Sequence, residues 1–295
     1  MDRIAVLALA LLATALVATE RASAQARPAS GQRVALVTGS TSGLGREVAT
    51  RLASDGWHVI VHGRSVERGE EVVAAIQSEG AGSARFLRAD FASFAEVRAL
   101  AEAILSDYDR LDVLVNNAGF GSSPDERLVS DDGHEFRFQV NYLSPFLLTH
   151  MLRPLVVASA PSRIVNVSSL AQQPIDFDDV MIEDGFSGGR AYGQSKLAQV
   201  LHTLDLHEEL ADEGVTVNAL HPATYMPTGM VRRAGVEPRA TIDEGADAVM
   251  QLIVGDIEGG QFFRGLEPAR AHGQAYDLDA RARLRRLSEE LTGIR

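Results

Sequence analysis

Short apolar runs alternate with longer amphipathic segments over most of the chain. Residues 34–37 form a continuous apolar run, and Leu44, Val48 and Leu52 then recur at helical spacing before Gly56. The pattern predicts strands at 34–37, 57–61, 85–87, 113–115, 164–167, 215–219 and 261–263, and later helices at 66–79, 93–108, 134–157, 190–212, 241–254 and 277–293. Strands that alternate with crossover helices predict an α/β fold with one doubly wound, parallel sheet of about seven strands and helices on both faces.

Two of these helices carry a further expectation. Pro145 lies inside the helix expected at 134–157, and we predict a kink there because proline cannot donate the helical hydrogen bond. In the tail, Leu284, Leu287 and Leu291 fall on one stripe and Gly293 ends the pattern. We expect this tail helix to pack on its own domain; a helix bound to a membrane or to a partner is the alternative.

Composition narrows the function. The net charge of -12 argues against a nucleic-acid partner, which would need phosphate neutralisation. The absence of cysteine excludes disulfides and thiolate catalysis. The 8 histidines show no metal-binding spacing, so no metal site is expected. A single catalytic domain over residues 33–295 accounts for the length.

The N-terminus is typical of an export signal. One arginine precedes an apolar run at 4–18, and the small residues Ala22-Ser23-Ala24 follow. We interpret residues 1–24 as a signal peptide of a periplasmic or secreted protein, or as an N-terminal membrane anchor. If the segment stays attached, the arginines that follow it favour a domain facing the cytoplasm. A wrongly assigned start is a third alternative. Residues 25–32 are predicted to form a linker.

A glycine-rich turn follows the first strand. Its residues run from Thr38 through Gly39, Ser40, Thr41, Ser42, Gly43, Leu44 and Gly45 into the first helix. Glycines let a ligand approach the backbone, and a helix N-terminus offers free N–H groups to phosphates. A glycine-rich turn between a strand and a helix therefore predicts a nucleotide site.

The only lysine of the chain is Lys196, four residues after Tyr192. Residues four apart share one face of a helix. A neighbouring ammonium lowers the pKa of a phenol, and such a phenol can exchange protons near neutral pH. The alternative is an ordinary surface pair on a helix.

With these motifs the chain resembles the short-chain dehydrogenase/reductase family over about residues 33–270. The glycine turn, Asn117-Ala118-Gly119 after the fourth strand, Asn141, Ser169 and the Tyr192–Lys196 pair follow the family's order. The resemblance implies a Rossmann-type fold, a small-molecule carbonyl or alcohol substrate and a homodimer or homotetramer. The 22 residues between Ser169 and Tyr192 are similar in number to the retinol-dehydrogenase-like and WW-domain-oxidoreductase-like branches.

The resemblance also implies roles for the four catalytic positions. Tyr192 would exchange the proton with the substrate oxygen. Lys196 would lower the pKa of Tyr192 and hold the nicotinamide ribose, Ser169 would orient the substrate, and Asn141 would anchor a water that connects Lys196 to solvent. The cofactor carries the hydride in such a scheme.

The end of the second strand indicates the cofactor. It reads His62-Gly63-Arg64-Ser65, without the acid that would bind the ribose of NAD. Arg64 and Ser65 can hold a 2′-phosphate, so NADP is preferred and NAD is the alternative; Arg64 as a solvated loop residue is the other interpretation. Asp90 and Phe91 resemble the family's adenine-contacting pair.

The chain departs from the family pattern in two places. After the sixth strand it has His221-Pro222-Ala223-Thr224 in place of Pro-Gly. Pro222 is expected to contact the cofactor, whereas the resemblance does not assign the other nicotinamide contacts of this loop. The insert before Tyr192 carries five acidic residues beside Phe177 and Phe186. An acidic rim would favour a neutral, apolar substrate, whereas a solvated loop is the alternative.

We therefore predict an NAD(P)-dependent oxidoreductase that acts on a carbonyl/alcohol pair. The alternative from another class is a nicotinamide-binding sensor or scaffold without turnover. The presence of Tyr192 argues against that alternative, because a binding module does not need a proton donor.

Overall fold

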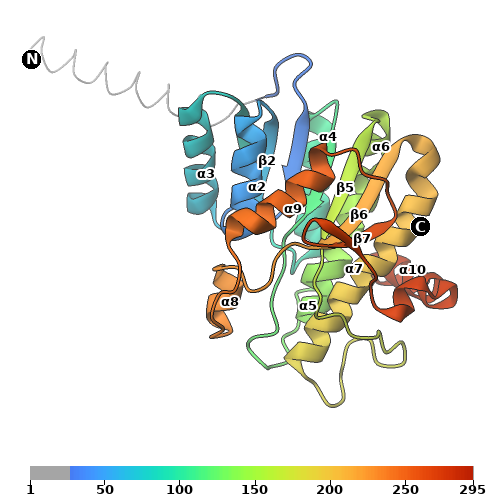
Figure 1. Cartoon of the computed structure of the whole chain (residues 1–295). Coiled ribbons are helices and arrows are strands. Elements are labelled where there is room, and N and C mark those ends of the chain that lie inside the picture. The colour runs from blue at the N-terminus through green and yellow to red at the C-terminus, as the bar shows by residue number, and fades with distance from the viewer. Residues whose placement is uncertain (1–26, 295) are drawn as a thin grey trace, which may run out of the picture.

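The structure is a computed structural model that describes residues 27–294 (Figure 1). The predicted signal peptide or anchor at 1–24, and residues 25 and 26 of the predicted linker, lie outside the described residues. In the described remainder of the linker, Gln32 donates to the carbonyl oxygen of Gly56, so this segment is tied to the domain. Within residues 27–294, no helix has the length and apolar character needed to cross a membrane.

One eight-stranded sheet forms the centre of the domain, in the order β3-β2-β1-β4-β5-β6-β7-β8. The strands are β1 (Val34–Val37), β2 (His58–Gly63), β3 (Ser83–Arg88), β4 (Val113–Asn116), β5 (Ser162–Val167), β6 (Val215–His221), β7 (Gln261–Arg264) and β8 (Glu267–Ala269). β1 to β7 run parallel, as predicted, and β8 adds an antiparallel edge that the pattern missed. The order reverses between β1 and β4, where doubly wound folds bind ligands.

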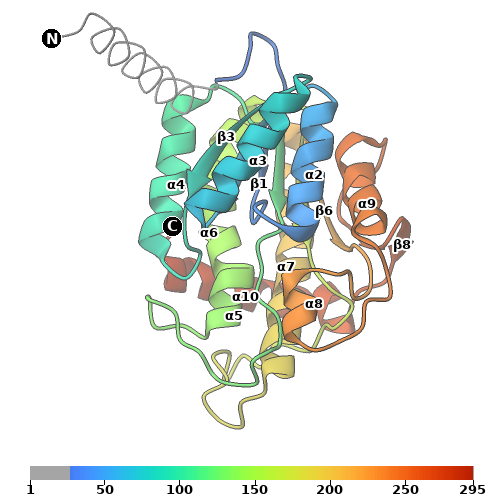
Figure 2. The ribbon, with the colours of Figure 1, turned by 90° about the vertical axis from the view of Figure 1, so that its left-hand side faces the viewer.

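Helices cover both faces of the sheet (Figure 2). α2 (Gly43–Ser54), α3 (Val66–Glu79) and α9 (Ile242–Val254) pack on one face, and α4 (Phe94–Asp107), α6 (Ser144–Ala158) and α7 (Gly188–Leu210) pack on the other. β1 is buried on both faces of the sheet. The side chains of Val34 and Leu36 belong to the core on one face, and those of Ala35 and Val37 belong to the core on the other. A strand buried on both faces needs apolar residues at every position.

The long helix expected at 134–157 is divided into three parts. α5 (Phe136–Phe138) leads into a π-helical turn, η1 (Gln139–Leu143), and α6 follows. Pro145 lies in the first turn of α6, so the discontinuity precedes the proline instead of lying at it. The missing N–H of Pro145 cannot bond the carbonyl of Asn141 four residues earlier, which favours the altered register.

The tail forms α10 (Leu278–Thr292) and packs on its own domain, as expected. Leu284 is buried, and the hydroxyl groups of Tyr142 and Ser288 lie 2.7 Å apart. The short elements η2 (Ala211–Glu213), α8 (Gly229–Arg233) and η3 (Gly273–Tyr276) complete the described chain.

Candidate active site

The turn after β1 is locked to the turn after β4. The hydroxyl of Thr38 accepts hydrogen bonds from the backbone N–H groups of Asn117 (2.9 Å) and Ala118 (3.0 Å) and donates to the carbonyl of Val115. The amide of Asn117 donates to the carbonyl of Thr38 at 2.8 Å. Two predicted motifs, 79 residues apart, thus form one rigid floor at the switch point.

Glycines keep this floor open. A Cβ at Gly39 would lie 2.8 Å from the Cα of Ala118, and a Cβ at Gly45 would lie 2.4 Å from the side-chain nitrogen of Asn117. Gly39 and Gly43 have positive φ angles of 65° and 57°, which favour glycine. Close backbone approach therefore depends on glycine at these positions.

The N-terminus of α2 fits a phosphate. Ser42 is its N-cap, is exposed and makes no capping hydrogen bond with its side chain. The first N–H groups of the helix are therefore not capped by this side chain, and the positive end of the helix dipole adds to their attraction for an anion. The residues present thus fit the diphosphate of a dinucleotide.

The side chain of Ser40 stabilises the glycine turn in which it lies. Its buried hydroxyl donates to the carbonyl of Val37 and accepts from the backbone N–H of His62. The side chains of Thr41 and Leu44 are also buried. These predicted cofactor residues can thus face a ligand chiefly through their backbone.

Arg64 and Asp90, predicted from separate motifs, lie side by side. The guanidinium of Arg64 is 3.6 Å from the carboxylate of Asp90, and 62% of the Arg64 side chain is exposed. Ser65 is the N-cap of α3 and accepts from the N–H of Arg68. A weakly paired guanidinium at a helix N-terminus is suited to an anion.

The ring of Phe91, a residue predicted to contact adenine, is buried, so any contact with adenine would come from its backbone. Only 3% of Phe91 is exposed, and its ring stacks on His62 with 4.6 Å between the centroids. Its ring is thus part of the core, and Asp90 remains the accessible member of the pair.

Asn141 lies in the π-helical turn and joins two segments. Its side-chain oxygen accepts from the backbone N–H of Phe120 at 2.6 Å, and its nitrogen donates to the carbonyl of Phe120 at 3.0 Å. The same nitrogen donates to the hydroxyl of Ser195 on α7 at 2.9 Å. Ser195, which sequence reasoning passed over between Tyr192 and Lys196, thus connects α7 to Asn141.

Lys196 is buried beside Tyr192. Its ammonium donates to the carbonyl of Val167 at 2.8 Å and to the side-chain oxygen of Gln199 at 3.0 Å. The ammonium is 5.8 Å from the centre of the Tyr192 ring. Burial lowers the pKa of Lys196 to about 7. Gln199 carried no signal in the sequence beyond its place one turn after the lysine.

Tyr192 faces Ser169 across the end of β5. Burial raises the pKa of the Tyr192 phenol, and the nearby hydroxyl of Ser169 only partly offsets this. The direction is opposite to the lowering expected from Lys196, because burial has the largest effect on the pKa of this phenol. The backbone N–H of Ala171 donates to Ser169 at 3.1 Å and fixes its orientation.

The loop after β6 closes over this floor. Thr228 caps α8, and its methyl group would lie 3.2 Å from a Cβ at Gly43. Pro222 is buried at the end of β6. Tyr225, which the sequence did not single out, has a positive φ of 52° and lies near enough to raise the pKa of Tyr192. A residue with an uncommon backbone conformation beside the half-buried Tyr192 is typical of a functional site.

The acidic insert is partly paired with arginines. Asp176 pairs with Arg190 at 2.8 Å, and Asp178 and Glu183 lie 3.6 and 3.9 Å from Arg283 and Arg127. The carboxylate of Asp179 accepts from the backbone N–H groups of Glu183 and Asp184. The insert is therefore locally ordered, while the side chains of Asp178 and Glu183 stay 97% and 79% exposed.

The known sequence pattern described as short chain dehydrogenase matches residues 33–238. The chain belongs to the short-chain dehydrogenase family. It is 35% identical over 286 residues to human retinol dehydrogenase 13, covering 89% of this chain and 85% of that protein. It is 34% identical over 278 residues to human retinol dehydrogenase 12, covering 89% and 87%.

Solved structures agree with this assignment. An uncharacterised protein from Mycobacterium paratuberculosis superposes with a TM-score of 0.75 at 30% identity, over 90% of this chain and 95% of that chain. The Pseudomonas aeruginosa RhlG/NADP active-site complex gives a TM-score of 0.64 at 29% identity, over 79% and 94%. This short-chain dehydrogenase of the retinol-dehydrogenase-like branch is an NAD(P)-dependent oxidoreductase that transfers hydride between nicotinamide and a carbonyl/alcohol pair.

Proposed function

We propose that this short-chain dehydrogenase is an NADP-preferring reductase of neutral, apolar carbonyl compounds. The observation that carries the proposal is the convergence of Tyr192, Ser169 and Lys196 at the end of β5, beside the glycine floor. A proton donor, an orienting hydroxyl and a cation next to a dinucleotide site are the groups that carbonyl reduction requires.

When bound, the nicotinamide supplies or accepts the hydride. Tyr192 gives its phenolic proton to the carbonyl oxygen, or takes the proton of an alcohol in the reverse direction. Ser169 donates a hydrogen bond to the same oxygen and fixes its position. Lys196 in its charged form favours the phenolate that remains after proton transfer.

Protein groups also connect the site to solvent and to the cofactor. We propose that Asn141 anchors the water through which Lys196 recovers a proton, since Asn141 already joins Phe120 to α7. Lys196 and the backbone at Asn117, Ala118 and Gly119 would hold the nicotinamide ribose. Gly39, Gly43 and Gly45 would receive the diphosphate through the start of α2.

Arg64 supports the preference for NADP. Its guanidinium is exposed, lies at the N-terminus of α3 and has only a long contact to Asp90. A 2′-phosphate at this point would gain charge-assisted hydrogen bonds from Arg64 and a further one from Ser65. The RhlG complex with NADP, a structure similar to this chain, agrees with the preference.

The relatives support an apolar substrate, because human retinol dehydrogenases 13 and 12 are similar in sequence to this chain and retinol is a largely apolar alcohol. The insert carries five acidic residues, of which Asp178 and Glu183 stay largely exposed, so it would repel an anionic substrate. We therefore propose a neutral aldehyde or ketone with a large apolar part. The homodimer or homotetramer stays a prediction.

NADP also bears on localisation. An uncleaved segment at 4–18 with the domain facing the cytoplasm agrees with the use of a cytoplasmic cofactor. Fractionation of cells tests this, because a mature domain found outside the membrane would contradict the proposed NADP preference.

The proposal is tested by NADPH and NADH oxidation with the purified protein over neutral aldehydes, ketones and quinones, including retinaldehyde, and over matched aldehydes that bear a carboxylate. NADPH-selective turnover of the neutral compounds is expected. Turnover with NADH alone would contradict the cofactor assignment. NADPH binding without any turnover would favour the sensor or scaffold.

A further inference from the structure

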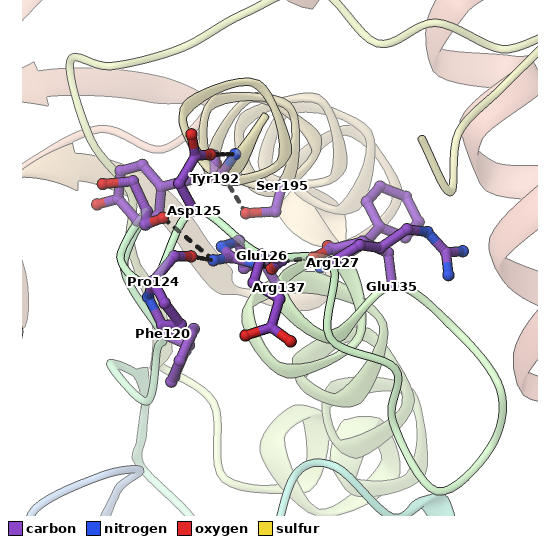
Figure 3. A network of polar contacts seen from close by, with 12 residues as sticks. Phe120, Pro124, Asp125, Glu126, Arg127, Glu135, Arg137, Tyr192 and Ser195 are labelled. Atoms are coloured by element: carbon purple, nitrogen blue, oxygen red, sulfur yellow. Dashed lines mark hydrogen bonds and ion pairs between the residues drawn. The ribbon is translucent and has the colours of Figure 1, made fainter. Parts of the chain in front are cut away.

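A single buried arginine organises the segment that follows the fourth-strand motif. Arg137, on α5, has no exposed surface. Its guanidinium donates to four backbone carbonyls within six residues: Gly121 (2.9 Å), Ser122 (3.1 Å), Pro124 and Glu126 (3.2 Å). In Figure 3, Arg137 lies among Pro124, Glu126 and Glu135.

The remaining donor of Arg137 bonds Glu135. The two side chains are 0% and 1% exposed and 3.1 Å apart, and the second oxygen of Glu135 accepts from the N–H of Phe138. The guanidinium also lies 5.4 Å from the ring centres of both Phe120 and Phe186. Every donor of the arginine is thus used, and its faces contact aromatic rings.

Besides the bonds from Arg137, segment 121–126 has two side-chain contacts: Ser123 donates to the carbonyl of Arg233 at 3.4 Å, and Asp125 accepts from Gly188. Within residues 27–294 the segment belongs to no helix or strand, and no backbone–backbone hydrogen bond holds it. Arg137 stands four residues before Asn141, which holds Phe120 in the same way. The helical stretch from α5 to η1 therefore fixes residues 120–126 through two side chains.

Segment 121–126 contacts the first residue of α7. The N–H of Gly188, the first residue of α7, donates to the carboxylate of Asp125 at 2.5 Å. A Cβ at Gly188 would lie 2.1 Å from the carbonyl oxygen of Ser122, so the two backbones are in direct contact. Tyr192 follows one turn later on the same helix.

We infer that Arg137 is a positioning residue: it shapes segment 121–126 so that the first turn of α7, and with it Tyr192, is held against the site. This inference rests on the proposed function for its kinetic consequence. A small displacement of a proton donor lowers the rate of the chemical step even when the cofactor still binds.

The test compares Arg137→Lys, Arg137→Met and the double variant Glu135→Gln with Arg137→Met in the full-length protein. We expect kcat/KM to fall about tenfold to a hundredfold in both Met variants, with a smaller loss for Lys. The Kd for NADPH should stay within about twofold, because Gly39 packs on Ala118 and Arg64 pairs with Asp90, both outside the segment. Amide hydrogen exchange should accelerate in residues 120–126 and 187–192 and stay unchanged in 39–45.

The double variant separates positioning from stability. It removes both buried charges, so its Tm should recover relative to Arg137→Met, whereas its activity should not. Recovery of both Tm and activity would overturn the inference. Equal loss of NADPH binding, or unchanged exchange in 187–192, would also overturn it.

One control variant completes the design. Arg281 on α10 is comparably buried, and it pairs at 2.5 Å with Asp205, which lies on α7 far from its first turn. The Arg281→Met variant should retain its activity per folded molecule. If the wild type turns over no carbonyl, the proposed function fails; the exchange data still decide whether Arg137 orders the start of α7.

Discussion

The ammonium of Lys196 lies 3.0 Å from the amide oxygen of Gln199, one turn further along α7, and both side chains are buried. The carbonyl of Val167 is the other acceptor. Both acceptors are neutral, so burial dominates and lowers the pKa of Lys196 to about 7. Because this pKa lies near neutral pH, small changes around the ammonium should change the fraction of Lys196 that is protonated.

The protonation of Lys196 can be measured without assignment, because the chain has one lysine. Labelling with lysine enriched in ¹³C at Cε gives one NMR signal, and we expect it to titrate near pH 7. Gln199→Glu should raise this pKa by adding a carboxylate, and Gln199→Leu should lower it. Gln77→Glu, exposed on α3, is the control and should leave it unchanged. Titration near about 10.4, as in an unfolded chain, would contradict the burial of the ammonium.

The same group links stability to pH. The pKa of Lys196 is about 7 in the folded chain, against 10.5 for an unperturbed lysine. Between these values the unfolded chain binds more protons, so the contribution of Lys196 to the free energy of unfolding rises with pH across this window. Lys196→Met should therefore be most stable relative to wild type at pH 7 and below, and this difference should shrink toward pH 10. Denaturant unfolding at several pH values measures it; a difference independent of pH would argue that the lysine is charged throughout.

Arg64 should decide between the two cofactors. Arg64→Ala removes charge-assisted hydrogen bonds to a 2′-phosphate, so the Kd for NADPH should rise about tenfold to a hundredfold while that for NADH changes little. Fluorescence titration of both cofactors measures this. Arg153→Ala, which removes a half-exposed arginine paired with Glu209 on another part of the surface, serves as the control. Equal weakening of both cofactors by Arg64→Ala would assign the residue a different role.

Glycine at the floor of the site should be indispensable. A Cβ at Gly45 would meet the side chain of Asn117 at 2.4 Å and the carbonyl of Gly39 at 2.6 Å. Gly45→Ala should therefore destabilise the fold by about 1–3 kcal/mol and weaken cofactor binding. Gly273→Ala, where a Cβ would meet nothing within 4 Å, should do neither. Thermal unfolding with and without NADPH measures both effects, and an unperturbed Gly45→Ala protein would mean that the two turns are not packed as described.

Local signals in the sequence predicted much of the fold. The bounds predicted for α3, residues 66–79, agree with the structure, because Ser65 caps its start and Gly80, with a φ of 75°, ends it. The π-helical turn at η1 could not be predicted, since it depends on contacts of Asn141 with distant residues. β8 was missed because three residues with a proline at a sheet edge leave no pattern.

The candidate site shows a similar division. The sequence predicted that Ser169, after β5, and the glycine turn, after β1, lie at the same edge of the sheet, because parallel strands end at one edge. The sequence pattern could not predict which way the side chains point. Those of Ser40 and Phe91 are buried in the protein. The raised pKa of Tyr192 depends on burial, which only the packed structure supplies.

The most direct test of the account is the rate of NADPH oxidation by Tyr192→Phe in the presence of a carbonyl compound that the wild type reduces. Phenylalanine keeps the ring and removes only the hydroxyl. The account predicts a loss of about 10²- to 10⁴-fold in kcat, with the Kd for NADPH little changed. A variant that retains most of its kcat would contradict the assignment of Tyr192 as the proton donor.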